Sequence, residues 1–185
     1  MIDPNLTLTG YGVTLRRLTH DKIEMLRQWR NDPKIQQYMA FREYITPEMQ
    51  EVWFQKINND HNFYFIIEYE GREMGMINIK DVDYEKKTGE PGIFIYDERL
   101  WDSDVGIRTS LCFGEFLWNT LSLDSTYVHV VASNKRAVQF NQFLDYEIIQ
   151  NDKDSENIMM ILKREKALNP NPKLAKIIRL FSNNN

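Results

Sequence analysis

The stretch ERLWDSDVGIRT, residues 98–109, is a polar loop that runs into an apolar segment and contains one glycine, Gly106. It follows residues 92–96, GIFIY, whose apolar side chains on both faces predict a central strand. Residues 105–121 predict a long helix. The unpaired N–H groups and the dipole at a helix start favour an anion, and glycine lets that anion approach the backbone closely. An ordinary strand-to-helix connection has the same pattern, so this loop alone assigns no function.

The segments on either side of this loop complete an α/β pattern. Aromatic and β-branched runs predict strands at 14–18, 63–69, 74–79, 127–131, 146–149 and 157–162, with a charged loop at 83–89. Apolar residues at helical spacing predict helices at 21–31, 35–39, 46–57, 134–144 and 173–181. We expect Asp21 and Thr46 to cap two of them, and Met49, Val52 and Phe54 to lie on a buried side. The order predicts an α/β fold, a central mixed twisted β-sheet flanked by helices.

Composition and termini narrow the class of protein. We expect one domain over residues 1–168 and a C-terminal extension over 169–185, with a short helix and a disordered tail. The net charge of −4 argues against a nucleic-acid binder. Cys112 is the only cysteine, so no intramolecular disulfide can form and a reducing compartment is expected. The chain shows no signal-peptide pattern and no long apolar run, which predicts a cytoplasmic protein with no membrane contact. The three histidines are far apart in the sequence, which predicts no metal site.

Residues 103–108, SDVGIR, resemble the acetyl-CoA motif Gln/Arg-x-x-Gly-x-Gly/Ala of the GCN5-related N-acetyltransferase (GNAT) family. Gly106 keeps a motif glycine, whereas Ser103 and Arg108 replace the first and last motif residues. Asp104 would repel a pyrophosphate unless it points away, and Arg108 could add a positive contact. The resemblance implies acetyl-CoA as cosubstrate and these contacts: Phe94, Ile95, Tyr96, Ser103, Asp104, Val105, Gly106, Ile107, Arg108, Thr109, Asn134, Arg136 and Phe140.

A second resemblance lies at residues 134–146, where the family has Asn-x-x-Ala, a tyrosine and then Gly-Phe. Asn134 and Ala137 match, and Asn134 is also a natural helix N-cap. Asn141 stands in the place of the tyrosine that often protonates the departing thiolate, and asparagine cannot act as an acid. Asp145 and Tyr146 stand where Gly-Phe is usual.

The N-terminal part is similar to the branch that contains ribosomal-protein N-terminal acetyltransferases and amino-sugar N-acetyltransferases of pseudaminic-acid-type pathways. The similarity rests on residues 15–18, on 26–33 with its Trp-Arg-Asn, on 38–39 and on 53–54, and the whole resemblance covers about residues 13–163. It implies transfer of an acetyl group to a primary amine, with an amino-sugar nucleotide of surface-polysaccharide synthesis as the first expectation. The alternative acceptors are a protein N-terminus and a polyamine, and the alternative function is a catalytically silent module that only binds the coenzyme. A homodimer is possible on the sequence alone.

Acetylation of an amine needs a neutral nucleophile, a rigidly held thioester and donors for the developing oxyanion. The resemblance implies a bulge near residues 93–96 that exposes backbone N–H groups, and Glu90 as the base. Asp81, Asp83 and His129 are the rival bases. We expect the acceptor contacts to be Trp29, Arg30, Tyr38, Trp53 and His129, with Phe41 as a further aromatic. Cations for a diphosphate are available at Arg16, Arg17, Arg27, Arg30 and Arg42.

Overall fold

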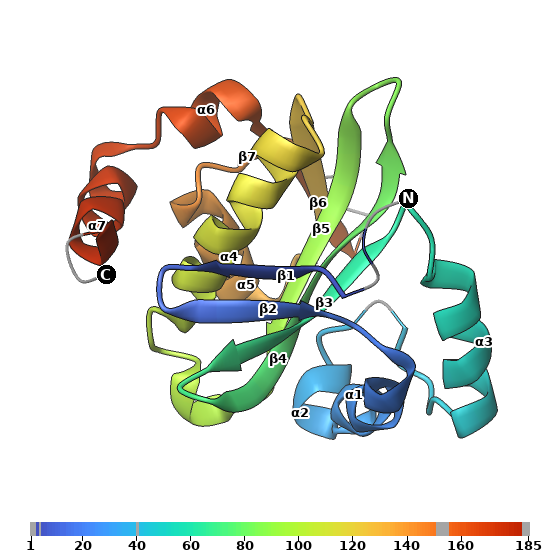
Figure 1. Ribbon diagram of the computed structural model, residues 1–185. Helices are drawn as coiled ribbons and strands as arrows, with labels where there is room; N and C mark the ends of the chain where they lie inside the picture. Colours follow the sequence, from blue (N-terminus) through green and yellow to red (C-terminus); the bar gives the residue numbers. More distant parts are fainter. Residues whose placement is uncertain (1–2, 4, 40, 151–155, 183–185) are drawn as a thin grey trace.

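A computed structural model describes residues 3, 5–39, 41–150 and 156–182, and Figure 1 shows their arrangement. The strands are β1 Thr7–Gly10, β2 Val13–Arg17, β3 Phe63–Tyr69, β4 Arg72–Asp83, β5 Thr88–Ile95, β6 Ser125–Val131, β7 Glu147–Gln150 and β8 Asn157–Lys163. The helices are α1 Ile23–Asn31, α2 Pro33–Gln36, α3 Pro47–Ile57, α4 Val105–Glu115, α5 Lys135–Phe143, α6 Arg164–Leu168 and α7 Pro172–Ser182. The expected α/β fold, a mixed sheet flanked by helices, is confirmed, and β1 and α6 are additions to the expected elements.

One sheet holds all eight strands in the order β1-β2-β3-β4-β5-β6-β8-β7. Every neighbouring pair is antiparallel except β5 and β6, which are parallel and pair only through Thr88↔Ser125 and Gly89↔Thr126. The sheet therefore opens between β5 and β6 beyond these two pairs. β5 is an interior strand of the sheet, as its apolar residues predict.

The β4–β5 ladder shows no bulge at residues 93–95, where the family resemblance led us to expect one. That ladder runs without a shift from Gly75↔Ile95 to Lys80↔Glu90, and its irregularity falls between Lys80 and Asp83. Asp81 within it has a φ of 54°, in the left-handed region. The charged loop expected at 83–89 is shorter, because β4 continues to Asp83 and β5 begins at Thr88.

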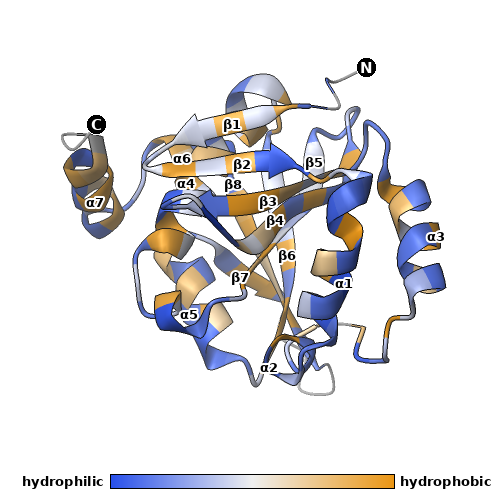
Figure 2. Cartoon of the chain, turned by 60° about the horizontal axis from the view of Figure 1, so that its bottom comes forward, coloured by the Kyte–Doolittle hydropathy of each residue, from blue (hydrophilic) through white to orange (hydrophobic). Residues whose placement is uncertain are grey.

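The two faces of the sheet bury separate cores. Phe63, Phe65 and Ile67 of β3 pack with α4 and the strands of the C-terminal half, whereas Tyr64 and Ile66 pack with α1 and α3. This division follows from the alternation of side chains along a strand. In Figure 1, α1 and α2 lie together on one side of the sheet and α4 and α5 on the other. Figure 2 shows the contrast between the hydrophobic runs of the central strands and the mixed residues of α1 and α3.

The helix caps show which local signals are reliable. Thr46 accepts a hydrogen bond from the N–H of Met49 and Pro47 follows it, as predicted. Asp21 caps nothing; its carboxylate accepts from the Thr19 hydroxyl, and a 3₁₀ turn at residues 20–22 precedes α1. α2 begins at Pro33 rather than at Ile35.

The buried side of α3 is narrower than predicted. Phe54 is buried, but the side chains of Met49 and Val52 are 40% and 65% exposed. The helix therefore lies against the sheet through a narrow stripe.

The helix expected at 105–121 changes character at Phe116. α4 ends at Glu115, and residues 116–120 form a π turn in which Leu121 N–H donates to the Phe116 carbonyl. Trp118, in that turn, lies over Gly114, where a Cβ would be 3.4 Å from the indole nitrogen. The helix expected at 173–181 is confirmed as α7. The polar turn at 151–155 and the tail at 183–185 lie outside the described residues.

Candidate active site

Backbone donors line the opening between β5 and β6. Tyr96 N–H donates to the carbonyl of Met74 on β4, so the neighbouring Ile95 faces the other way. The Ile95 carbonyl accepts instead from the indole N–H of Trp101, at 2.7 Å. By the same alternation the N–H groups of Ile93 and Ile95 face the opening, where β6 offers them no ladder partner. Such fixed donors suit the oxygen of a thioester whose charge increases in the transition state.

Glu90 and His129 meet across the mouth of this opening. One Glu90 oxygen lies 3.1 Å from His129 Nδ1, and the other lies 3.2 Å from Lys80 Nζ. The Glu90 side chain is only 16% exposed, whereas that of His129 is 45% exposed. In the neutral imidazole, when Nδ1 carries the hydrogen that Glu90 accepts, Nε2 is an acceptor. His129 is thus a partly exposed histidine held by a carboxylate rather than a core histidine.

The rival carboxylates have different surroundings. Asp83 accepts hydrogen bonds from the N–H groups of Glu85 and Lys86 and pairs with Lys86 Nζ at 3.0 Å, and these bonds lower its pKa. It serves the β4–β5 turn. Asp81 is exposed on the irregular part of β4.

The start of α4 presents free N–H groups. Ser103 Oγ accepts from Val105 N–H at 3.3 Å, and the first helical bond runs from Arg108 N–H to the Asp104 carbonyl. Among the described residues, the N–H groups of Gly106 and Ile107 have no acceptor, and Asp104 makes no side-chain cap. This is the geometry of an anion site at a helix N-terminus.

The expected coenzyme contacts on α4 do not all face solvent. The side chains of Val105 and Thr109 are fully buried, so only their backbone is available to a ligand. Arg108 is occupied: it pairs with Asp104 at 2.9 Å and donates to the carbonyl of Tyr11 at 3.0 Å.

The start of α5 lies close to the same loop. Arg136 pairs with Asp102 at 3.1 Å and stacks over Trp101, with its guanidinium 5.4 Å from the ring centroid. Asn134 accepts from Ala137 N–H at 3.0 Å, which confirms the predicted N-cap. Asn141, one turn further, donates back to the Ala137 carbonyl at 2.9 Å.

Gly106 has a packing reason as well as a binding one. A Cβ at this position would lie 3.2 Å from Cε2 of Phe140 on α5, which is tighter than an ordinary contact. The glycine thus lets α5 approach the start of α4. Phe140, expected as a coenzyme contact, packs on the Cα side of Gly106.

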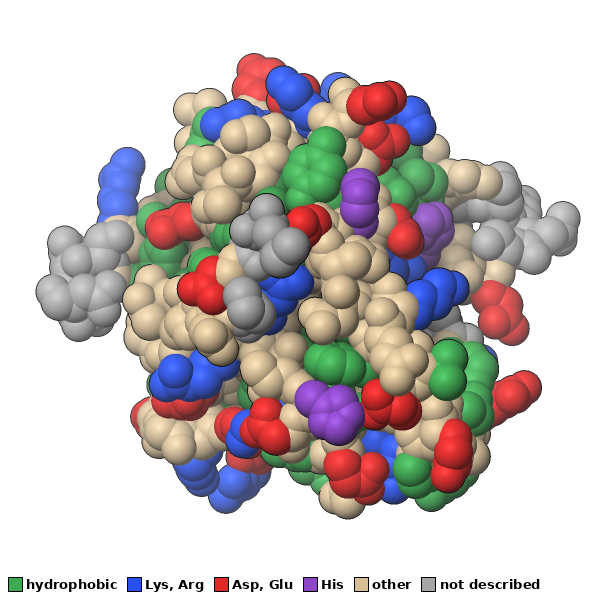
Figure 3. All heavy atoms as spheres, turned by 45° about the vertical axis from the view of Figure 1, so that its right-hand side comes forward, with side chains coloured by type: hydrophobic (Ala, Val, Ile, Leu, Met, Phe, Trp, Pro, Cys, Tyr) green, Lys and Arg blue, Asp and Glu red, His purple; other side chains and the backbone are tan. Residues whose placement is uncertain are grey.

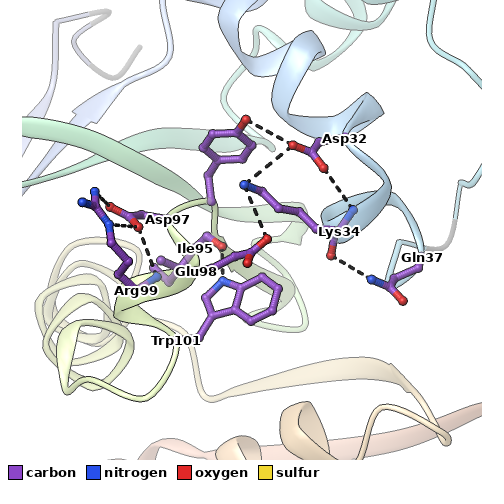
Figure 4. A network of polar contacts seen from close by, with 9 residues as sticks. Asp32, Lys34, Gln37, Ile95, Asp97, Glu98, Arg99 and Trp101 are labelled. Atoms are coloured by element: carbon purple, nitrogen blue, oxygen red, sulfur yellow. Dashed lines mark hydrogen bonds and ion pairs between the residues drawn. The ribbon is translucent and has the colours of Figure 1, made fainter.

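A stacked pair of aromatic rings lies on the face of the sheet that α1 covers. Trp29 stacks on Tyr96 with centroids 5.1 Å apart, and Phe94 meets the Trp29 ring at its edge. Figure 4 shows the polar network around the Tyr96 hydroxyl, which donates to Asp32 at 3.2 Å. Lys34 lies 3.9 Å above the Tyr96 ring and 3.7 Å from both Asp32 and Glu98. These contacts hold the Tyr96 side chain just beyond the end of β5.

Arg30 lies beside this network without an anionic partner. Its guanidinium stacks over Trp53, 5.1 Å from the centroid, and reaches only the amide oxygen of Gln50, at 3.5 Å. No carboxylate among the described residues lies within ion-pair distance of it. Burial lowers the pKa of Arg30. A half-buried cation of this kind is a natural contact for an anionic group of a ligand.

Tyr64 connects Arg30 to the Glu90–His129 pair. Its ring meets Trp53 at 5.1 Å. Burial raises the pKa of Tyr64 to about 12, Arg30 opposes the shift, and Asp81 and Glu90 add to it. In the register of the sheet Tyr64 pairs with Asn78, and Lys80 pairs with Glu90, so Tyr64 and Glu90 lie on the same face of the sheet, the face that α1 covers.

Other expected acceptor residues lie at the surface. Tyr38 and Phe41 are 45% and 42% exposed, at either side of an undescribed residue. Of the other arginines, Arg16 pairs with Glu68 and Arg27 with Glu24, so neither is free for a phosphate. Figure 3 shows side chains of both signs interspersed on one face of the molecule.

Sequence reasoning missed Tyr64, Lys80 and the Asp32–Lys34 pair. In the sequence, Asp32 and Pro33 come directly after the helix predicted at 21–31, and nothing in that local pattern pairs Asp32 with the distant Tyr96. The described residues contain no group of three or more His, Cys, Asp or Glu side chains arranged to hold a metal ion. Within the same residues, no helix combines the length and apolarity needed to cross a membrane.

A family model described as "Acetyltransferase (GNAT) domain" matches residues 13–144. The chain belongs to the GNAT acetyltransferase family. It is an acetyltransferase, and enzymes of this family use acetyl-CoA as cosubstrate. Acetyltransferase PseH of Campylobacter jejuni is 24% identical over 152 residues, which cover 82% of this chain and 93% of that protein.

Solved structures share the GNAT fold with this chain. A structure described as apo FdhC, a nucleotide-linked sugar GNAT, superposes with a TM-score of 0.76 at 20% identity, over 92% of this chain and 97% of the other. Spermidine N-acetyltransferase from Vibrio cholerae, in complex with CoA and spermine, gives a TM-score of 0.72 at 18% identity, over 85% and 98% of the two chains. At these identities the likeness concerns the fold, and the acceptor has to be argued from the site.

Proposed function

We propose that this GNAT enzyme acetylates the primary amine of an anionic acceptor, and that the acceptor is an amino sugar linked to a nucleotide diphosphate. The observation that carries this proposal is the unpaired, half-buried Arg30. Its planar guanidinium is suited to bind two phosphate oxygens at once. The partly buried ring of Trp53 offers a flat apolar surface for a sugar or base, whereas Trp29, also expected as an acceptor contact, is buried in the core beneath Tyr96.

A polyamine acceptor fits this arrangement less well. A polycation needs carboxylates to balance its charges, whereas a fixed guanidinium repels it in a site with reduced solvent screening. The GNAT fold occurs both in FdhC, a nucleotide-linked sugar GNAT, and in a spermidine N-acetyltransferase, so the fold does not choose the acceptor and the charges at the site have to. Arg30 favours the anion.

The same face supplies the chemistry of transfer. His129 Nε2, oriented through Nδ1 by Glu90, accepts the proton that the acceptor's ammonium group must lose so that the neutral amine can attack the thioester carbon. The N–H groups of Ile93 and Ile95 stabilise the oxyanion, and the free N–H groups of Gly106 and Ile107 bind the pyrophosphate of acetyl-CoA. Asn141 gives no acid, and coenzyme A leaves as its thiolate.

Thiol release from acetyl-CoA tests the proposal with a panel of acceptors: an amino sugar, the same sugar carried on a nucleoside diphosphate, spermidine and a peptide with a free N-terminus. We expect turnover of the nucleotide-linked sugar at the lowest KM. Arg30→Met should raise that KM about 10- to 100-fold, because a hydrogen bond to a charged group contributes about 1.5–3 kcal/mol.

The free amino sugar serves as the internal control, since its KM should not respond to Arg30→Met. Arg16→Met is the matched protein control, because Arg16 is exposed and already paired with Glu68. Preferred turnover of spermidine or of the peptide, or equal loss for the free and nucleotide-linked sugars, would contradict an anion site at Arg30.

A further inference from the structure

Two neighbouring side chains in the middle of the sheet carry polar groups that the protein itself does not satisfy. Tyr64 of β3 and Asn78 of β4 are each only 8% exposed. Among the described residues, neither the Tyr64 hydroxyl nor the Asn78 carboxamide has a hydrogen-bond partner. Neither group is fully enclosed either, because the enclosed polar atoms without a partner in the described part of the chain belong to Arg17, Arg108 and Thr109. Nearly buried polar groups are usually hydrogen-bonded, so this pair is available to a ligand.

The sheet register places this pair beside the candidate base. Tyr64 pairs with Asn78, and Asn78 pairs with Gly92 of β5, so the three residues form one row on the face that α1 covers. Gly92 leaves room for the carboxamide, since a Cβ there would lie 3.1 Å from Asn78 Oδ1. Glu90 comes two residues before Gly92 and therefore lies on the same face, about 7 Å along the strand. A group bound over this row thus lies next to the Glu90–His129 pair.

On its other side the pair adjoins the candidate anion contact. The Trp53 ring meets the Tyr64 ring at its edge, with centroids 5.1 Å apart. Arg30 lies over the same Trp53 ring, 5.1 Å from its centroid. An acceptor whose phosphate binds Arg30 and whose amine reaches His129 has its sugar between them. That sugar lies over the row of Tyr64 and Asn78.

We propose that Tyr64 and Asn78 bind the sugar ring of the acceptor, through hydrogen bonds from the Tyr64 hydroxyl and the Asn78 carboxamide to ring hydroxyl groups. This inference deepens the proposed function and rests on it. A sugar hydroxyl both donates and accepts, so it satisfies the carboxamide oxygen, the carboxamide NH₂ group and the phenol alike. A charged polyamine only donates, and it leaves the donors of both side chains unpaired. Tyr64 and Asn78 thus determine specificity for the sugar, whereas Arg30 recognises the nucleotide diphosphate.

Thiol release from acetyl-CoA, measured with Tyr64→Phe and Asn78→Leu, tests this pair. Both changes remove polar atoms and nearly keep the shape of the side chain. Each should lower kcat/KM about three- to tenfold, for the free amino sugar and the nucleotide-linked sugar alike, as expected for a hydrogen bond between uncharged groups. Arg30→Met, by contrast, should affect only the nucleotide-linked sugar. With the deoxy sugar that lacks the hydroxyl bound by the altered residue, variant and parent should have the same kcat/KM.

Thermal unfolding separates sugar binding from a structural role. Because neither group has a partner within the described residues, both variants should leave Tm unchanged or raise it. Tyr146→Phe and Asn171→Leu are the matched controls, since the Tyr146 hydroxyl bonds to Thr126 at 2.8 Å and the Asn171 amide donates to Asp145 at 2.9 Å. These controls should lower Tm and leave the acceptor kinetics unchanged.

A parent enzyme that turns over the nucleotide-linked sugar, with variants that keep its kcat/KM, overturns the role of the pair and leaves the proposed function standing. A loss of the same size for every acceptor, deoxy sugars included, together with a lower Tm, assigns the pair a structural role and also overturns the inference. The two variants are independent, so if one does not fold the other decides. A parent that turns over no amino sugar overturns the proposed function and this inference together.

Discussion

Replacing Glu90 with glutamine keeps the size of the side chain but removes the charge that orients His129. The bond at risk is the 3.1 Å contact between the Glu90 carboxylate and His129 Nδ1. A hydrogen bond to a charged group contributes about 1.5–3 kcal/mol, and about 1.4 kcal/mol is a tenfold change in rate. We therefore expect Glu90→Gln to lower kcat about 10- to 100-fold at neutral pH. His129→Ala removes the base itself and should cost about 10²–10⁴.

The assay is the pH dependence of kcat, followed by thiol release with a saturating acceptor. The losses should shrink at high pH, because an amine that is already neutral no longer needs a base. Asp83→Asn is the control, since the Asp83 carboxylate is held by the N–H groups of its own turn.

Glu90 and His129 are expected to act as one unit. The double variant of Glu90 and His129 should then be no slower than His129→Ala alone, since effects within one unit are not additive. A His129→Ala enzyme with the parent rate and pH profile would refute the assignment of the base. Additive losses would show that Glu90 acts independently of His129.

Three further changes test other parts of the structure. Gly106→Val should destabilise the chain by about 1–3 kcal/mol, since its branched side chain displaces Phe140, and should weaken coenzyme A binding; thermal unfolding and titration measure the two effects. Asn141→Tyr should change kcat by no more than about tenfold, below a full general-acid contribution; a larger gain would show that thiolate protonation limits the parent enzyme. Burial raises the pKa of Cys112 and of Tyr146 to about 12, from ordinary values of 9.0 for a thiol and 10.0 for a phenol. Because the unfolded chain loses these protons first, stability should fall as pH rises from about 9 towards 12 in denaturant titrations, and Tyr146→Phe should flatten the upper part of that fall.

Local patterns predicted the elements whose causes are local. Strand β3 was predicted at its observed bounds because its aromatic and β-branched run ends in the Glu70–Gly71 turn. The caps at Thr46 and Asn134 followed from single side chains and their neighbours. The break at Phe116 did not, because a π turn satisfies packing around Trp118 rather than a propensity.

The candidate site depended on contacts that span the chain. Glu90 and His129 were separate candidates in the sequence, and only the parallel pairing of β5 and β6, followed by their separation, makes them a pair. Arg30 was one of several arginines with equal claims. Arg16, Arg27 and Arg42 have carboxylate partners. Arg17 has none among the described residues, but it is buried over Phe63 and donates to the Asn59 carbonyl, whereas Arg30 is half-buried over Trp53.

The departures from the family motif have a structural explanation of their own. Asp145 keeps the left-handed backbone of the usual glycine, with a φ of 68°, and its carboxylate bonds to Asn171 offset the cost of that conformation. Arg108 stands where a small residue is usual and contacts Phe181. Both residues hold α7, so neither is evidence that turnover has been lost. Of these departures, only Asn141 concerns proton transfer. The thiolate of coenzyme A is a good leaving group, so its departure does not require an acid at this position.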